Sequence, residues 1–415
     1  MLTRRRFVLT GGAAVVGVAA VAAGINQAVR PGSSSVPRVA LGTQPGGLPA
    51  RQHAWLATLA RDADGDPISP RHDRLLFFFV VGRPSEAHAR VLEASLRTLE
   101  RSYRWGPSGL LFTAGWSPAY FEHALGVSSP IPNAKALSDF ELPTIDDYHL
   151  CLHLACDDDE RLGAVEAALA HGRPLAGADG HTALGGALSW RETRTGFAGA
   201  GLPARYQDTA GIPAGRPVAG AAPLFMGFKS GLVKNQATED AVTIDAEPFA
   251  GGTTMHVSYM RLRLDSWYGQ LSQRERIARM YAPQVTPGQV EHFTTDAESD
   301  PKLLGQAINR YGVIGHAQTS ARARRNGKPL ILRRDFDTVD GGQAGLHFVA
   351  LQRTIADFVT TRTAMNATSA QLQNPAIGDT VNNGINEFIF VVRRANYILP
   401  TRAQRAFPLV PRSWA

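Results

Sequence analysis

The chain has 415 residues and a formal charge of +7, but residues 1–30 hold four arginines and no acidic residue, so the remainder carries only +3. That small excess does not indicate a nucleic-acid-binding protein. The only cysteines are Cys151 and Cys156, which excludes a fold held together by a disulfide framework.

The first residues resemble a twin-arginine export signal. Arg4 and Arg5 follow Thr3 and precede Phe7, which is the order of residue types in such signals. Residues 11–25 are apolar and include Ala20-Val21-Ala22, whose small side chains suit a signal peptidase. This apolar run is too short for a membrane span, which needs about 20 residues. We therefore expect residues 1–30 to be a cleaved signal rather than an anchor or an amphipathic helix, with the twin-arginine translocase as partner and the periplasm or cell exterior as destination.

The rest of the chain divides by composition into a tether and a folded part. Residues 31–70 are rich in proline, glycine and serine, and about 345 residues follow. That length allows one large core or two ordinary domains. We expect an N-terminal domain over residues 71–215, a C-terminal domain over residues 216–400 and a tail over residues 401–415.

Residue patterning in the first half predicts the order strand, helix, strand, strand, helix, strand. One helix is expected to begin after Ser85 and a second within the acidic run 157–160. The acidic run caps the second helix or, as a weaker alternative, binds a cation. The strands fall at residues 75–81, 109–115, 148–156 and 184–194, and a short helix follows Ser117 and Pro118.

The strand at residues 148–156 alternates, so Cys151 and Cys156 face opposite sides and cannot pair. His149, Cys151 and His153 share one face, which either chelates a metal or is simply a face of mixed polarity that lacks a fourth ligand. A similar argument applies to Met255, His256 and Met260. Their spacing is poor for copper because Met255 faces away from the other two, and core packing explains the methionines.

A second round of elements predicts a second domain of similar plan. Helices are expected at residues 266–281 and 354–365, and strands at 256–264, 330–335, 346–352 and 387–392. The predicted fold class is therefore α+β, with two ferredoxin-like domains that carry antiparallel sheets, as in the dimeric α+β barrel type.

Three segments occur in a distinctive order: Gly227-Phe228-Lys229-Ser230-Gly231, then Gly315-His316-Ala317, then residues 330–336 around Arg333 and Arg334. Together with segments such as Asp265-Ser266-Trp267, they resemble the dye-decolourising peroxidases over nearly all of residues 71–400. Members of that family are haem enzymes built from two ferredoxin-like domains, many exported by the twin-arginine route and many dimeric or ring-like. The resemblance implies haem b, hydrogen peroxide and an unidentified reductant as ligands, and a homo-oligomer.

The same resemblance assigns roles to residues. His316 matches the axial ligand of the haem iron, and Glu387 or Asp379 is a candidate carboxylate on its far nitrogen. Arg333, or Arg334 if the match slips by one, corresponds to an arginine over the open haem face that stabilises negative charge. Gly227, Phe228 and Gly231 would lie close to the cofactor, although a tight turn explains the glycines equally well. Basic residues nearby either pair with haem propionates or form a solvated loop: Arg322, Arg324, Arg325 and Lys328.

Ser230 is a departure from that family. The glycine-flanked motif normally carries an aspartate that relays a proton, and a serine hydroxyl is no general base at neutral pH. Glu239 and Asp240 follow closely and are candidate substitutes. Three hypotheses remain: a haem peroxidase of altered efficiency in which Ser230 holds water, a haem-binding or carrier protein that lost catalysis, and a scaffold without haem.

Overall fold

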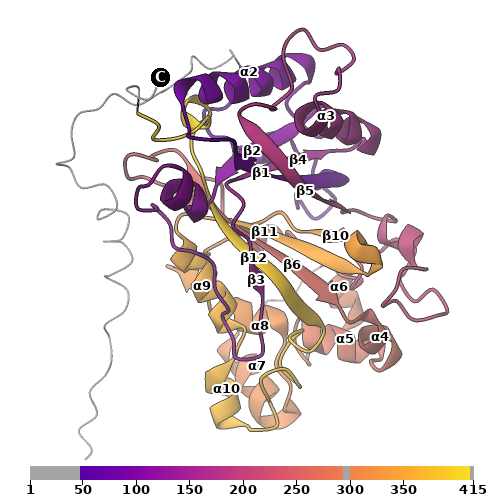
Figure 1. Cartoon of the computed structure of the whole chain (residues 1–415). Helices are drawn as coiled ribbons and strands as arrows, with labels where there is room; N and C mark the ends of the chain where they lie inside the picture. The colour runs from indigo at the N-terminus through magenta and orange to yellow at the C-terminus, as the bar shows by residue number, and fades with distance from the viewer. Residues whose placement is uncertain (1–46, 293–299, 412–415) are drawn as a thin grey trace, which may run out of the picture.

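The computed structural model describes residues 47–292 and 300–411 (Figure 1). The predicted export signal, the first part of the predicted tether and the last four residues lie outside the described residues. Among the helices that are described, none combines the length and the apolar character that crossing a membrane requires.

The first half of the chain forms an antiparallel sheet in the strand order β5-β1-β4-β2. In this order β1 lies between β5 and β4, and β4 separates β1 from β2. This is the split βαβ arrangement of ferredoxin-like domains. The elements follow the predicted order: β1 (His72–Val80), α2 (Glu86–Ser102), β2 (Leu111–Trp116), η2 (Tyr120–Ala124), β3 (Thr144–Ile145), β4 (Leu150–Cys156), α3 (Asp159–His171) and β5 (Leu188–Phe197).

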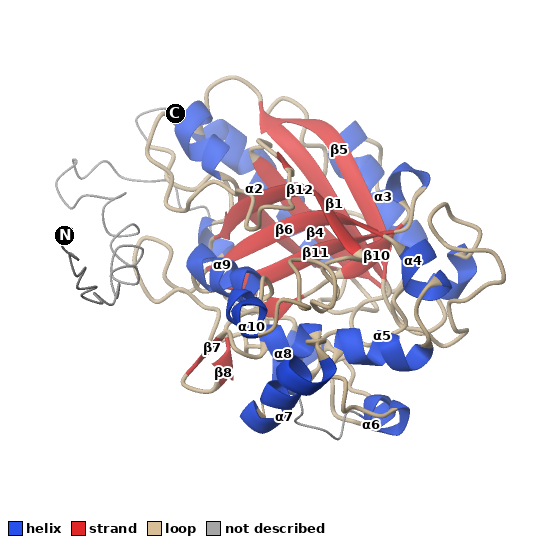
Figure 2. Ribbon diagram, turned by 90° about the horizontal axis from the view of Figure 1, so that it is seen from below, coloured by secondary structure: helices blue, strands red, loops and turns tan. Residues whose placement is uncertain are grey.

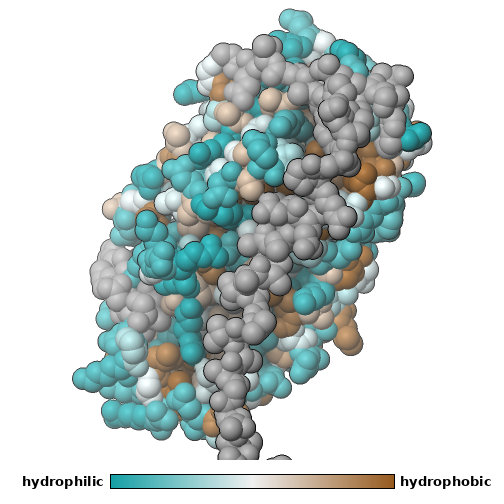
Figure 3. Space-filling model, turned by 90° about the vertical axis from the view of Figure 1, so that its left-hand side faces the viewer, coloured by the Kyte–Doolittle hydropathy of each residue, from teal (hydrophilic) through white to brown (hydrophobic). Residues whose placement is uncertain are grey.

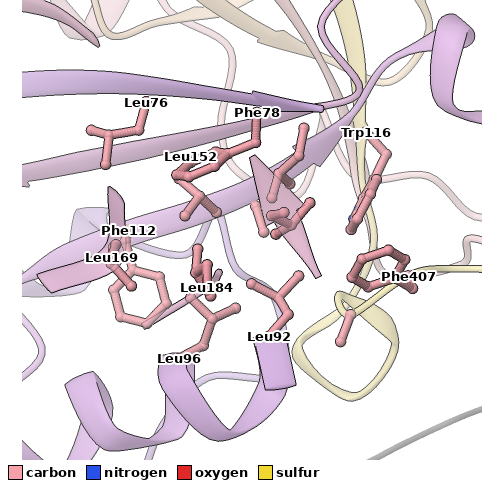
Figure 4. Packing of buried hydrophobic residues seen from close by; sticks show 14 of the residues in the cluster. Leu76, Phe78, Leu92, Leu96, Phe112, Trp116, Leu152, Leu169, Leu184 and Phe407 are labelled. Atoms are coloured by element: carbon pink, nitrogen blue, oxygen red, sulfur yellow. The ribbon is translucent and has the colours of Figure 1, made fainter. Parts of the chain in front are cut away.

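Local sequence explains where the two helices of this half begin. The Ser85 side chain accepts a hydrogen bond from the His88 N–H, and Asp158 does the same for Arg161, so both predicted caps are confirmed. Leu92 and Leu96 of α2 point at Leu76 and Phe78 of the sheet (Figure 4). These contacts bury one face of the helix and one face of the sheet in a single core.

The second half repeats this plan in the strand order β12-β6-β11, with β9 and β10 beside β11. The predicted fold class is therefore confirmed. The strands are β6 (Thr253–Leu262), β7 (Arg324–Arg325), β8 (Lys328–Pro329), β9 (Leu332–Arg333), β10 (Phe336–Thr338), β11 (Gly345–Gln352) and β12 (Ile389–Leu399). The helices are α4 (Leu264–Gly269), α5 (Gln273–Met280), α6 (Pro287–His292), α7 (Pro301–Gln306), η5 (Ala307–Tyr311), α8 (His316–Ser320), α9 (Ile355–Ala364) and α10 (Thr368–Gln373).

Two joints connect the halves into one closed sheet. Ile398 of β12 pairs with Trp116 of β2, and on the other side Asp337 of β10 pairs with Phe197 of β5. β10 also pairs with β11 from Phe336 to Thr338. The side chains inside the ring form a second core that includes Phe77, Val257, Val349 and Tyr397. Helices α2 and α3 cover the outer face of the first half, whereas α5, α8 and α9 lie along the second (Figures 1 and 2).

Several predicted elements have different bounds in the structure. The predicted helix 266–281 is two helices, because Ser272 and Glu275 form a capping box that starts α5 afresh. The predicted strand 330–335 shrinks to β9, since only Leu332 and Arg333 pair with β11. The last strand continues to Leu399, seven residues beyond its predicted end, because pairing with β6 extends that far.

The two groups considered as metal ligands have structural partners instead. Met255 lies in the interior core, and His256 shares hydrogen bonds with Asn396 and Ser258. His153 shares a hydrogen bond of 2.8 Å with Asp73, and the Val80 N–H donates to His149 Nδ1. Both cysteines are buried and free. Within residues 47–292 and 300–411, no three histidine, cysteine or carboxylate side chains group together as a metal site.

On the face seen in Figure 3, hydrophilic side chains prevail and hydrophobic ones form separate patches.

The residues after β12 fasten the second half onto the first. Arg402 and Arg405 are fully buried and both bond the Glu100 carboxylate of α2, and Arg405 also bonds Glu93. Phe407 packs against Trp116, with ring centroids 4.8 Å apart (Figure 4). This C-terminal segment thus joins α2 to the end of the last strand. Short 3-10 turns complete the described chain: η1 (Leu56–Thr58), η3 (Pro203–Tyr206), η4 (Val233–Asn235), η6 (Asp340–Gly342) and η7 (Arg402–Gln404).

Replacing Glu100 by glutamine should lower the free energy of unfolding by roughly 3–5 kcal/mol, because Arg402 would stay buried without a carboxylate and Arg405 would keep only Glu93. Urea denaturation followed by circular dichroism measures the loss. Glu86→Gln on the same helix is the matched control, because its partner Arg90 is exposed. That substitution should cost under about 1 kcal/mol. Equal losses in the two variants would contradict a buried clamp at Glu100.

Candidate functional site

A cavity lies between the outer face of the second half of the sheet and helices α5, α8 and α9. Figure 2 shows the arrangement of these helices along the sheet. Most of the cavity lining is apolar, which excludes water and strengthens the electrostatic interactions of the few charged groups inside. Strand β6 contributes Met260 and Leu262, β11 contributes Leu346 and Phe348, and α9 contributes Phe358. The charged and polar side chains in the lining are Lys229, Ser230, Asn235, Ser258, Tyr281, His316, Ser320, Arg324, Arg333, Asp335, Asp337, Thr361, Arg362 and Arg394.

His316 enters this cavity from the first residue of α8. Its surroundings lower the pKa of the imidazole to about 3, chiefly through burial and then through the positive charges of Arg333 and Arg362. The ring is therefore neutral at physiological pH, which is the state that binds a metal. Among the described residues, its Nδ1 has no hydrogen-bond partner although it is buried.

Two glycines fix the backbone of His316. A Cβ on Gly315 would lie 1.9 Å from the Tyr281 carbonyl oxygen, and one on Gly384 would lie 3.0 Å from His316 Cα. Gly384 also has a φ of 55°, a left-handed conformation that favours glycine. The backbone on either side can approach His316 closely only because both positions lack a side chain.

The segment from Ile331 to Asp337 alternates between the interior of the ring and the cavity. Leu332 and Phe336 belong to the interior core, whereas Arg333, Asp335 and Asp337 line the cavity. The structure therefore distinguishes Arg333 from Arg334, the two alternatives that the sequence offered for the arginine in the site. Arg333 faces the cavity, and its buried Nε has no hydrogen-bond partner among the described residues.

Arg334 points the other way, into the ring. Its guanidinium carbon lies 3.8 Å from the centroid of the Trp55 ring, and its Nη2 donates to the His53 carbonyl oxygen. Burial lowers the pKa of Arg334 to about 10. Since Arg334 is not among the lining residues, the structure gives no support to its expected contact with a cofactor.

The glycine-flanked loop meets the cavity with its middle residues. Phe228 and Ser230 line it, whereas Gly227 and Gly231 do not and have φ values of 85° and 79°. The tight-turn interpretation thus accounts for both glycines. Lys229 is also in the lining and forms ion pairs with Asp62 and Asp66 from the N-terminal segment.

Neither acidic substitute for Ser230 reaches the cavity. Glu239 accepts hydrogen bonds from the Trp55 and Leu56 N–H groups, and Asp240 pairs with Arg51. Asp379 and Glu387 do not form the hydrogen bond to His316 that was expected of one of them. In the described part of the chain, His316 Nδ1 has no hydrogen-bond partner. The backbone carbonyls of Asp379 and Glu387 are occupied by other residues.

The predicted basic cluster is divided among structural partners. Arg322 donates to Ser369, and Arg325 pairs with Asp357. Arg324 borders the cavity but donates to the carbonyl oxygens of Ala321, Gly327 and Lys234. These contacts explain the cluster largely as loop structure.

Two arginines that the sequence did not single out also border the cavity. Arg362 and Arg394 both bond the buried Glu141 carboxylate. Burial lowers the pKa of Arg394 to about 10, and its Nε and Nη1 lack partners within the described residues. The strand pattern around Arg394 could not reveal this position, because β12 has a bulge between Val391 and Arg393 that shifts the register.

Comparison with protein families identifies one match. Residues 70–401 match the model of a family of unknown function, DUF7405. The chain belongs to this family. No curated protein matches the chain in sequence.

Solved structures with the same fold include several dye-decolourising peroxidases. A putative DyP-type peroxidase from Shewanella oneidensis has a TM-score of 0.52 and 15% identity, covering 81% of this chain and 94% of that one. A DypB variant from Rhodococcus jostii in complex with heme has a TM-score of 0.57 and 14% identity, and the match covers 86% of this chain and 98% of that one. The encapsulated DyP-type peroxidase from Mycobacterium smegmatis has a TM-score of 0.53 and 16% identity, and the match covers 85% of this chain and 100% of that one. At these identities the likeness shows that this DUF7405 chain shares the fold.

Gly315→Ala should displace His316, because the new methyl group cannot fit beside the Tyr281 carbonyl. We expect a loss of roughly 1–3 kcal/mol in the free energy of unfolding, as for other overpacked sites. Gly305→Ala is the control, since nothing lies within 4 Å of a Cβ there. In helix α7 it should be neutral or stabilising by up to about 1 kcal/mol. Chemical denaturation of both variants measures the difference, and a Gly315→Ala protein as stable as wild type would contradict this packing argument.

Proposed function

We propose that this DUF7405 protein binds haem b in the cavity and uses hydrogen peroxide to oxidise a reductant. The observation that carries the proposal is the neutral, half-buried His316 in an apolar cavity that also holds Arg333; its buried Nδ1 lacks a hydrogen-bond partner in the described structure. The fold shared with dye-decolourising peroxidases, one of them in complex with heme, supports it.

The donor groups in the cavity suit the chemistry of a haem. A neutral imidazole is a common axial ligand of haem iron, and His316 supplies one. The partnerless N–H groups of Arg394, at Nε and Nη1, match a propionate carboxylate, which accepts such paired donors. The apolar side chains of β6 and β11 would pack against the faces of the macrocycle.

When bound, the haem would supply the redox chemistry, and the chain's residues would prepare the peroxide. Arg333 carries a fixed positive charge in a cavity of low polarity, where it would stabilise the negative charge that develops on a departing oxygen. The Ser230 hydroxyl would hydrogen-bond a water or peroxide molecule at the edge of the same cavity. His316 would remain neutral while it holds the iron.

A second function has one specific observation in its favour. A serine stands where the resemblance implies a proton-relaying aspartate, and a hydroxyl cannot take up a proton at neutral pH. A haem carrier would keep His316 and Arg394 without needing that relay. Steady-state assays separate the two, because turnover no faster than that of free haem identifies a carrier.

Purified full-length protein expressed with a supply of haem should show a Soret band. His316→Ala should shift the band and weaken haem binding by more than about 10-fold, since loss of even an outer partner of a metal ligand commonly costs that much. Titration with haem measures the affinity, and His181→Ala, at an exposed histidine, should leave it unchanged. A wild-type protein without any Soret band would overturn the proposal.

Export by the twin-arginine translocase is also part of the proposal, because a haem protein that folds around its cofactor in the cytoplasm must cross the membrane folded. Replacing Arg4 and Arg5 by lysines should retain the protein in the cytoplasm of a host that has this translocase. Fractionation with haem staining measures the distribution. Equal export of the lysine variant would contradict a twin-arginine route and leave the haem site unaffected.

A further inference from the structure

Two carboxylates share the cavity-facing side of the segment that carries Arg333. Asp335 and Asp337 line the cavity at alternate positions, which an extended chain separates by about 7 Å. Both are almost completely buried: the side chain of Asp335 is 8% exposed, and Asp337 as a whole is 1% exposed. Buried carboxylates without a lysine or arginine bonded to each are costly, so such a pair points to a function.

The orientation of Asp337 is fixed by the loop that leads to Ser230. One carboxylate oxygen, Oδ2, accepts a hydrogen bond of 2.6 Å from the Phe225 N–H. Tyr268 donates to the carbonyl oxygen of the same residue at 2.7 Å, so this part of the loop is held on both sides. The other oxygen, Oδ1, is buried and has no hydrogen-bond partner among the described residues.

The two carboxyl groups have different surroundings. Asp335 Oδ1 lies 4.0 Å from Arg333 Nε, within the distance of an ion pair. Burial raises the pKa of Asp337 well above its ordinary value, and the negative charge of Asp335 raises it further. Two neighbouring acids in different environments are the usual arrangement for one group that accepts and one that donates a proton.

No other group in the described cavity lining offers this chemistry. Ser230 is not a base, and Lys229 is engaged by Asp62 and Asp66. Glu141 lies behind Arg362 and Arg394, which bond both of its oxygens. His316 is the candidate iron ligand. The aspartates therefore remain the only carboxylates in that lining.

We propose that Asp335 and Asp337, rather than Ser230, are the proton-exchanging groups of this cavity, an inference that rests on the proposed peroxidase function. Asp335 accepts a proton from one oxygen of hydrogen peroxide and delivers it to the other. The O–O bond then breaks, its electron pair leaves with the second oxygen, and that oxygen departs as water. When bound, haem would supply the two electrons, and the reductant would restore them together with one proton. Asp337 retains a second proton beside Asp335 and donates it, so that the remaining oxygen receives two electrons and two protons and is released as water.

The test uses the full-length protein with five single substitutions, of which Asp335→Glu serves only the rate measurement. Asp335→Asn and Asp337→Asn remove a titrating group but keep an oxygen acceptor, so Asp337→Asn can still hold the Phe225 N–H. Ser230→Ala probes the competing relay. Asp208→Asn is the matched control, because that side chain is exposed and far from the cavity lining.

Infrared spectroscopy of the haem-free protein gives the first measurement. Wild type at neutral pH should show the carbonyl band of a protonated carboxyl group, which Asp337→Asn removes and Asp208→Asn retains. This result does not depend on catalysis. A spectrum without such a band, or a band that survives Asp337→Asn, would overturn the role of Asp337.

Stopped-flow mixing of the haem-loaded variants with hydrogen peroxide gives the second measurement. Asp335→Asn should slow the reaction by at least about 100-fold, the usual contribution of general acid–base catalysis, with haem affinity unchanged. Asp335→Glu should recover part of the rate, and Ser230→Ala should lose much less than Asp335→Asn. If haem binds and Ser230→Ala is as slow as Asp335→Asn, this inference fails alone. If wild type binds no haem, or binds it without reacting with peroxide, the proposed peroxidase function fails with it.

Discussion

Strand β10 joins the two sheets, and the geometry of the cavity depends on that joint. Its three residues pair with β11 on one side, and Asp337 pairs with Phe197 of β5 on the other. Because β10 is held between two strands, the chain from Ile331 to Asp337 cannot rotate about its own axis. A one-residue slip would exchange the two faces and bring Arg334 into the cavity in place of Arg333.

The cavity combines an apolar lining with charged groups whose energies are set by burial. Burial favours the neutral form of His316, and Arg394 keeps donors that no described residue satisfies. Such groups are costly in a closed core but useful where a charged or metal-containing ligand completes them. The same low polarity raises the pKa of Asp337 well above its ordinary value. The charge state of the site therefore follows from the packing of β6, β11 and α9 around it.

Much of the fold could be predicted from short-range patterns. Helical spacing at Leu92 and Leu96 and the caps at Ser85 and Asp158 identify α2 and α3, because these signals depend only on neighbouring residues. The break between α4 and α5 and the full length of β12 could not be predicted. The break depends on a capping box that competes with a continuous helix, and the strand length depends on pairing with β6.

For the candidate site, the sequence by itself determined the residue types: His316 after a glycine, two adjacent arginines, and a serine in a glycine-flanked loop. Only the tertiary structure decided that Arg333 faces the cavity, that Glu239 and Asp240 do not, and that Asp335 and Asp337 do. The physical reason is that residue type is local, whereas the direction of a side chain depends on strand register, which is set by the pairing of β10 and β11 with segments far along the chain.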